Sequence, residues 1–128
     1  MKAVEYDISI NQNAAFLLRV TLNDENGDPI DLSSYAGEFV IRKTITSPTA
    51  VLRATSGDGH LTFAATGPNV VASLTGAQTD ALPTGNREVN DWVYEILIWD
   101  PADEPNTALR FLYGTVHVSP SAARPDDP

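Results

Sequence analysis

The sequence has no cysteine, only two histidines and only eight Lys and Arg residues in 128. Without cysteine, disulfides, thiolate zinc sites and thiol nucleophiles are excluded. Seventeen Asp and Glu residues give a formal net charge of -9, which argues against nucleic acid and anionic membranes as partners, since both attract clustered basic residues. No apolar run approaches the ~20 residues of a membrane span, and the acidic residues within 1–7 do not fit a signal peptide.

Hydrophobic residues make up 42% of the chain, enough to fill a core. A domain of this length buries roughly 65–70% of its unfolded surface. From Pro120 onward the sequence holds three of the nine prolines and no large apolar residue. We therefore predict one domain over residues 1–119 and a Pro-rich C-terminal tail over 120–128.

Apolar residues recur mostly with a period of two, which is typical of half-buried strands. In the most apolar run, Trp92, Tyr94, Ile96 and Ile98 share one face, and the residues between them share the other. Only residues 78–82 suggest a helix, of about one turn. The expected strands span residues 4–10, 14–22, 30–32, 38–45, 51–55, 61–64, 70–74, 92–99 and 108–118, the last broken at Gly114.

These nine or ten short strands, separated by turn sequences, predict an all-β fold. The spacing favours an antiparallel β-sandwich or a Greek-key barrel.

One acidic turn has a spacing that binds calcium in other proteins. Asp24, Asn26 and Asp28 follow the D-x-N-x-D pattern that opens an EF-hand loop, but Pro29 stands where that loop needs glycine. The Asn-Gly pair at this place favours a tight hairpin turn. We predict a turn, with a weak calcium site that includes Asp31 as the alternative.

No catalytic constellation is visible in the sequence. His60 and His117 are expected to be surface residues, the alternative being a metal site or a catalytic dyad. No serine lies in a G-x-S-x-G elbow. Residues 57–59, Gly-Asp-Gly, are followed by no helix that could bind phosphate, and so predict a turn. We therefore predict a protein that is not an enzyme and that holds no metal or cofactor.

The aromatic residues allow a second class of function. Trp92, Tyr94, Trp99 and Tyr113 could form a platform for sugar rings, as in a carbohydrate-binding module used in host adsorption. Aromatic side chains in so apolar a strand usually fill a core or an interface. Trp92 and Trp99 also fall on opposite faces, which favours packing over a shared platform.

Acidic residues concentrate in two segments, 24–31 and 100–104. Solvated loops that maintain solubility are the simpler interpretation. The alternative is an electrostatic patch that meets a basic neighbouring subunit.

Three short motifs occur in a characteristic order. They are D-x-x-G-x-P-I-D-L at residues 24–32, L-P-x-G at 82–85 and R-x-L-x-G-x-V-x-V at 110–118. With the strands between them, they span about residues 4–120. This succession resembles a group of small tailed-phage structural proteins that are similar to the N-terminal domain of the phage upper baseplate protein.

The resemblance implies an Ig-like β-sandwich in a bacteriophage virion. Members of this group attach fibres or baseplate parts or decorate the capsid surface, through protein–protein contacts. The implied partners are other phage capsid, tail or fibre subunits, with the chain in several copies or as a homo-oligomer, and neither nucleic acid nor membrane. The implied location is the virion, assembled in the host cytoplasm.

The tail is the predicted partner-contact segment. Arg124 is expected to pair with a carboxylate of a neighbour, and Asp126 and Asp127 with basic residues, beside Pro125. The alternative is an end of the chain without a role.

Overall fold

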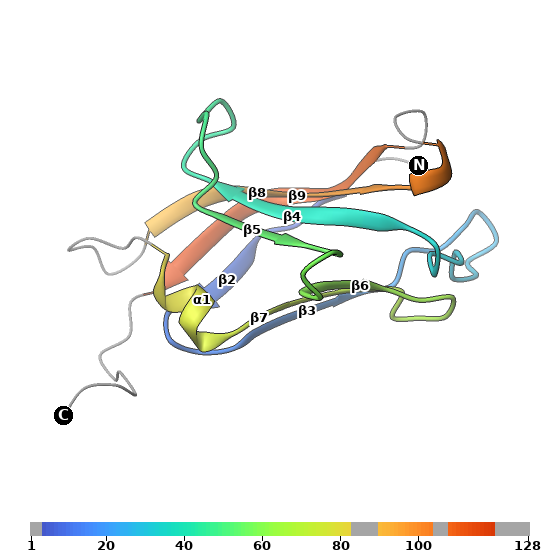
Figure 1. Cartoon of the computed structure of the whole chain (residues 1–128), viewed down its shortest axis with the longest axis horizontal. Coiled ribbons are helices and arrows are strands. Elements are labelled where there is room, and N and C mark those ends of the chain that lie inside the picture. The colour runs from blue at the N-terminus through green and yellow to red at the C-terminus, as the bar shows by residue number, and fades with distance from the viewer. Residues whose placement is uncertain (1–3, 83–89, 104–107, 120–128) are drawn as a thin grey trace.

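The structure is a computed structural model that describes residues 4–82, 90–103 and 108–119 (Figure 1). The described residues form nine strands, one short α-helix and one 3-10 helix. The strands form two sheets that lie as two layers, with the apolar side chains between them (Figure 1). The all-β class predicted from the sequence is confirmed.

Sheet A has six strands in the order β1-β9-β8-β4-β5, with β2 also paired to β9. Its longest members, β8 and β9, lie side by side at its centre and join the N-terminal strands to β4. The bounds are β1 Val4–Glu5, β2 Ile8–Asn11, β4 Ala36–Arg42, β5 Leu52–Thr55, β8 Asn90–Trp99 and β9 Leu109–Ser119.

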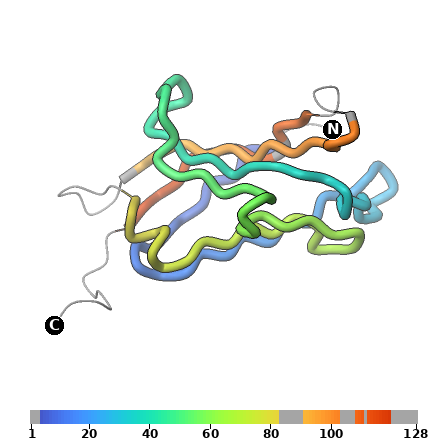
Figure 2. The backbone as a smooth tube through the Cα atoms, viewed as in Figure 1, coloured from blue at the N-terminus to red at the C-terminus, as the bar shows by residue number. Residues whose placement is uncertain are grey.

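Sheet B has three antiparallel strands in the order β3-β7-β6. Their bounds are β3 Phe16–Val20, β6 Leu61–Phe63 and β7 Val70–Leu74. The chain crosses from sheet A to sheet B after β2 and after β5, so neighbours in sequence lie in different layers (Figure 2).

The core lies between the sheets, and strand alternation decides which side chains enter it. On β8, Tyr94, Ile96 and Ile98 are buried, as the sequence predicts, and they pack beside Phe39 and Ile41 of β4. The Phe39 and Tyr94 rings stack at 5.6 Å between centroids. The fully buried large side chains are Phe39, Ile10, Leu32, Ile41, Leu61, Leu82, Ile96, Ile98, Val70, Val116 and Val118.

The prediction of a purely antiparallel fold is wrong for one part of sheet A. Both β1 and β2 run parallel to β9, with Ile8 opposite Val116. A parallel pair needs no tight turn, and β2 and β9 come from opposite ends of the sequence. Sheet A is therefore mixed.

The expected strand 4–10 is interrupted, and its first half is not buried. Only Ile8 and Ile10 enter the core, whereas Val4 and Tyr6 are 56% and 54% exposed. The break at Tyr6 and Asp7 is held in place from both sides. The Thr115 amide donates to Asp7 Oδ1 at 3.0 Å, and the Tyr94 hydroxyl donates to the carbonyl of Tyr6.

Gly114 does not interrupt β9, contrary to the sequence-based expectation. It makes room for the N-terminal break instead, because a Cβ at this position would lie 2.5 Å from the carbonyl oxygen of Tyr6. Gly114 is paired with Tyr94, and burial of that phenol, with Asp7 nearby, raises its pKa and keeps it neutral.

Two buried amides connect distant loops to the sheets. The Asn69 side chain donates to the carbonyls of Leu22 and Ile30 at 2.9 and 2.8 Å, and its oxygen accepts from the Leu22 amide at 2.7 Å. It fixes both ends of the turn 23–29 to sheet B. Gln12 donates to the carbonyls of Asp80 and Leu82, which secures the end of the helix.

The helix α1 spans Gly76–Asp80, two residues before the predicted turn of helix. Its start is fixed by a capping box in which Thr75 and Gln78 exchange hydrogen bonds with each other's backbone amides.

Candidate functional site

The side of sheet A that points away from sheet B, hereafter the outer face, belongs to the larger of the two sheets. On each strand, it receives the residues that alternate with the core. Its members are Glu5 of β1, Ser9 and Asn11 of β2, Glu38, Val40 and Arg42 of β4, Arg53 and Thr55 of β5, Asp91, Val93, Glu95, Leu97 and Trp99 of β8, and Arg110, Tyr113, Thr115 and His117 of β9.

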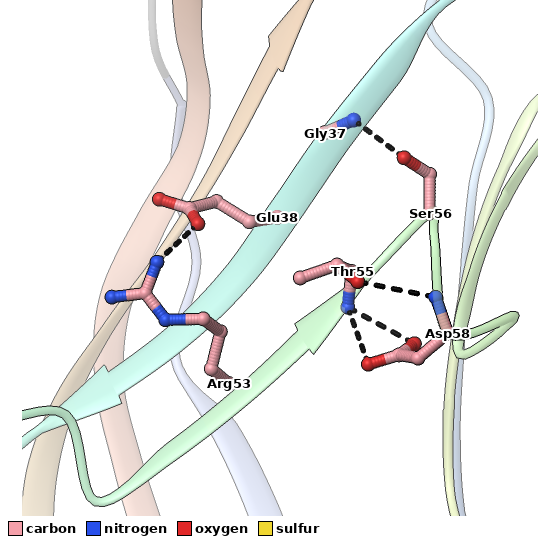
Figure 3. Close-up of polar contacts among 6 residues, drawn as sticks. All are labelled: Gly37, Glu38, Arg53, Thr55, Ser56 and Asp58. Atoms are coloured by element: carbon pink, nitrogen blue, oxygen red, sulfur yellow. Dashed lines mark hydrogen bonds and ion pairs between the residues drawn. The ribbon is translucent and has the colours of Figure 1, made fainter.

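Charged side chains on the outer face are paired across neighbouring strands. Arg53 Nη1 lies 2.5 Å from Glu38 Oε2 (Figure 3). Arg110 Nη1 lies 3.7 Å from Glu95 Oε2, and its guanidinium carbon lies 4.4 Å from the centroid of the Tyr113 ring. Such exposed pairs stabilise a fold by only about 0–1 kcal/mol each. Their main effect here is that each positive side chain offsets a negative one on the face.

Between the two ion pairs the outer face is slightly hollow and of mixed polarity. Val40, only 8% exposed, and Val93 lie in a shallow pocket of about 160 Å³. The pocket is lined by Glu38, Val40, Arg42, Ile45, Val93, Tyr94 and Glu95. Nearby, Arg110 covers the ring of Tyr113, and Arg and Tyr are enriched at protein–protein interfaces.

Ile45 extends this surface beyond the sheet. It is 67% exposed, the most exposed of the large apolar residues that the structure describes. β4 ends at Arg42 instead of the predicted residue 45, because a turn follows in which the Ser47 amide donates to the Thr44 carbonyl at 3.1 Å. Arg42 Nη1 donates to the carbonyl of Ser47 at 3.0 Å and fixes the turn to the outer face.

An irregularity between β8 and β9 places Arg110 on this face. The register shifts between Ile96 and Leu97, so that Ile96 pairs with Leu112 and Leu97 with Arg110. Strict alternation would put Arg110 on the same side as the buried Leu112. A β-bulge reverses the side on which the following residues point, and it thereby brings Arg110 to Glu95.

The free edge of β5 is covered by its own turn. Both oxygens of Asp58 accept from the Thr55 amide at 3.1 Å, and Thr55 Oγ1 accepts from the Asp58 amide (Figure 3). Burial alone would raise the pKa of Asp58, but hydrogen bonds from the amides of His60 and Thr55 lower it. The predicted turn at 57–59 is confirmed, and it hinders strand addition at this edge.

The acidic segment 24–31 also forms a turn, as predicted. Asp24 Oδ1 accepts from the amides of Asn26 and Asp28, and Gly27 has a φ of 83°. Asp31 Oδ1 accepts from the hydroxyl and the amide of Ser33, which lower its pKa. These carboxylates bind their own backbone, and the described residues include no group of three or more potential metal ligands.

The two histidines lie in different parts of the fold. His60 precedes β6 in sheet B, and its Nδ1 lies 3.0 Å from the carbonyl oxygen of Ser73. His117 lies on the outer face of sheet A, 2.7 Å from Asp91 Oδ1. The structure therefore does not bring them together into a dyad.

The aromatic residues are divided between the two sides of sheet A, as parity predicts. Trp92 and Tyr94 face the core, and Trp99 and Tyr113 belong to the outer face. Lys43 lies over the Trp92 ring at 5.8 Å, and Arg110 covers the Tyr113 ring. The four rings do not form one platform, and the carbohydrate-binding alternative stays a prediction.

Several predicted contacts lie outside the described residues. The tail 120–128, with Arg124, Pro125, Asp126 and Asp127, is among them, as are residues 104–107 of the second acidic segment. Alternation in the sequence had placed Val93, Glu95, Leu97 and Trp99 of β8 together on one face. It gave no signal that β4 lies beside β8, or that Arg53 and Arg110 complete the face.

Among the described residues, there is no helix with the length and apolar character needed to cross a membrane. No protein-family model matches the chain, and no curated protein matches its sequence.

Proposed function

We propose that this chain is a structural protein of a tailed-phage virion, with an Ig-like β-sandwich fold, that acts through protein–protein contacts and catalyses no reaction. The observation that carries the proposal is the outer face of sheet A, on which Arg53–Glu38 and Arg110–Glu95 border a shallow pocket that contains Val40 and Val93. Arginine and aromatic residues, here Arg110 over Tyr113, are enriched on surfaces that bind proteins.

Two further observations support the proposal. The order of the sequence motifs at residues 24–32, 82–85 and 110–118 resembles that of small phage attachment proteins. The polar turns that the structure describes bind their own backbone and so stiffen the ends of the strands, and the described residues include no group of three or more potential metal ligands. A rigid scaffold that presents one face suits an adaptor for fibres or baseplate parts, or a decoration of the particle surface.

Quantitative mass spectrometry of purified particles of the encoding phage tests the proposal. We expect the chain in the particles at a fixed copy number. Tens to hundreds of copies would identify a capsid decoration or a repeated tail shell, and copies in threes or sixes a fibre or baseplate adaptor. Absence from washed particles, with the protein present in the lysate, would overturn it.

A further inference from the structure

The outer face of sheet A differs in charge from the chain as a whole. It carries three arginines, Arg42, Arg53 and Arg110, and four carboxylates, those of Glu5, Glu38, Glu95 and Asp91. Its formal charge is therefore -1 with His117 neutral, whereas the whole chain carries -9. Two copies of this chain that approach through their acidic loops repel each other, whereas two outer faces repel each other much less.

The positions of these charges suit a second copy of the same face. The glutamates lie on the inner strands β4 and β8, and Arg53 and Arg110 lie on the flanking strands β5 and β9. In a two-fold contact the same patch meets itself, and an axis oblique to the strands places an arginine of one copy over a glutamate of the other. Arginine suits this role because its planar guanidinium can bind two carboxylates at once.

The size of the face is sufficient for such a contact. Five strands lie across sheet A at a spacing of about 4.8 Å, and β4 contributes seven residues at about 3.4 Å each. The face therefore measures about 24 by 24 Å, or roughly 1,100 Å² in total for two copies. This area exceeds the ~800 Å² of most packing contacts and lies near the lower limit of specific interfaces.

We propose that a second copy of this chain binds the outer face of sheet A, forming a two-fold dimer with Val40 and Val93 at its centre and Ile45 at its margin. The inference rests on the proposed function, since it names the partner of the same contact face. The centre supplies the apolar contact, and the arginine–glutamate pairs at its border fix the orientation of the two copies.

Sedimentation equilibrium of the purified full chain at several concentrations tests the proposal, with circular dichroism as the check of folding. We expect a monomer–dimer equilibrium that Val93→Glu weakens by about tenfold or more, because it places a charge in the apolar centre. Arg53→Glu should also weaken it, and its side chain is 47% exposed, so this variant should fold even if the first does not.

Leu17→Glu is the matched control, since Leu17 is 51% exposed on the outer side of sheet B. It should leave the dimer unchanged. A chain that is monomeric at all concentrations, or a dimer that the Leu17 variant weakens and the Val93 and Arg53 variants do not, would overturn the inference. If the chain is monomeric in solution but present in particles, the proposed function stands and only the dimer is refuted. If the chain dimerises but is absent from particles, only the proposed function is refuted.

Discussion

The two faces of sheet A are built from alternate residues of the same strands and have opposite characters. On the inner face, β4 and β8 present Phe39, Ile41, Tyr94 and Ile96, all at most 3% exposed. The outer face of these strands carries charged residues over a valine floor. The inner face therefore supplies the free energy of folding, and the outer face can vary in charge without threatening the fold. Substitutions on the two faces should have separate effects on stability and association.

The largest loss of stability is expected from Phe39→Ala. Phe39 is fully buried and stacks on Tyr94, so truncation leaves a cavity between the sheets and should lower the free energy of unfolding by about 3–5 kcal/mol. Val93→Ala, on the outer face, should cost less than about 1 kcal/mol. Urea denaturation measures both, and equal losses would contradict the division between the faces.

Asn69→Ala tests whether the core tolerates the buried Asn69 side chain because the hydrogen bonds of that side chain are all formed. The substitution leaves the Ile30 carbonyl and the Leu22 amide without the Asn69 partner, while the Leu22 carbonyl keeps its bond from the Ile30 amide, and it should cost about 2–3 kcal/mol. Asn26→Ala, in the exposed turn that Asn69 secures, should change stability by about 0.5 kcal/mol or less. The comparison is made by thermal and urea unfolding of both variants.

Gly114→Ala tests the close approach of the N-terminal break to β9. The added methyl group would clash with the Tyr6 carbonyl and should cost about 1–3 kcal/mol. At Gly57 the nearest atom to an added Cβ, Thr55 Oγ1, is 3.7 Å away, so Gly57→Ala should be nearly neutral. Calorimetric melting of the Gly114 and Gly57 variants checks the expectation, which fails if the Gly114 variant has the same melting temperature as the wild type.

Glu38→Gln addresses the outer face itself. The Arg53 pair is partly exposed, so its loss should lower the free energy of unfolding by no more than about 0.5 kcal/mol. The same variant should weaken dimerisation several-fold at low salt and less at high salt. A large loss of stability with unchanged association would reverse the roles assigned to the two faces.

The smallest effect on stability is expected in the turn 56–59 that follows β5. The pKa of Asp58 is lower in the fold than the ordinary 3.8, so its carboxylate stabilises the native state above that pH. This contribution is lost as the pH falls through the lowered pKa. Asp58→Asn should therefore reduce the melting temperature slightly at pH 7, and the difference from the wild type should shrink as the pH falls below 3.8.

The sequence predicted the parts of the fold that follow from local patterns. Alternation on β8 assigned Trp92 and Trp99 to opposite sides, and the Asn-Gly and Gly-Asp-Gly segments formed the expected turns. It could not predict the parallel pairing of β2 with β9, because strand order depends on contacts between distant residues. For the same reason it gave Gly114 the wrong role, since the atom that needs the space belongs to Tyr6.

The candidate site was harder to predict than the fold. Alternation placed Val93 and Glu95 on one face of β8, but their grouping with Val40 and Arg42 depends on β4 lying beside β8, about 50 residues later in the chain. Arg110 reaches the face only through the register shift, which has no signal in the sequence. The predicted contacts at Arg124–Asp127 lie outside the described residues and stay predictions.

Photo-crosslinking in assembled particles tests the central claim most directly. A photoreactive phenylalanine analogue would replace Val93 on the outer face of sheet A or, as the control, Leu17 on the outer side of sheet B. The account predicts efficient crosslinks to a virion protein, including a second copy of this chain, from position 93 and few from position 17. Crosslinks from position 17 with none from position 93 would contradict it.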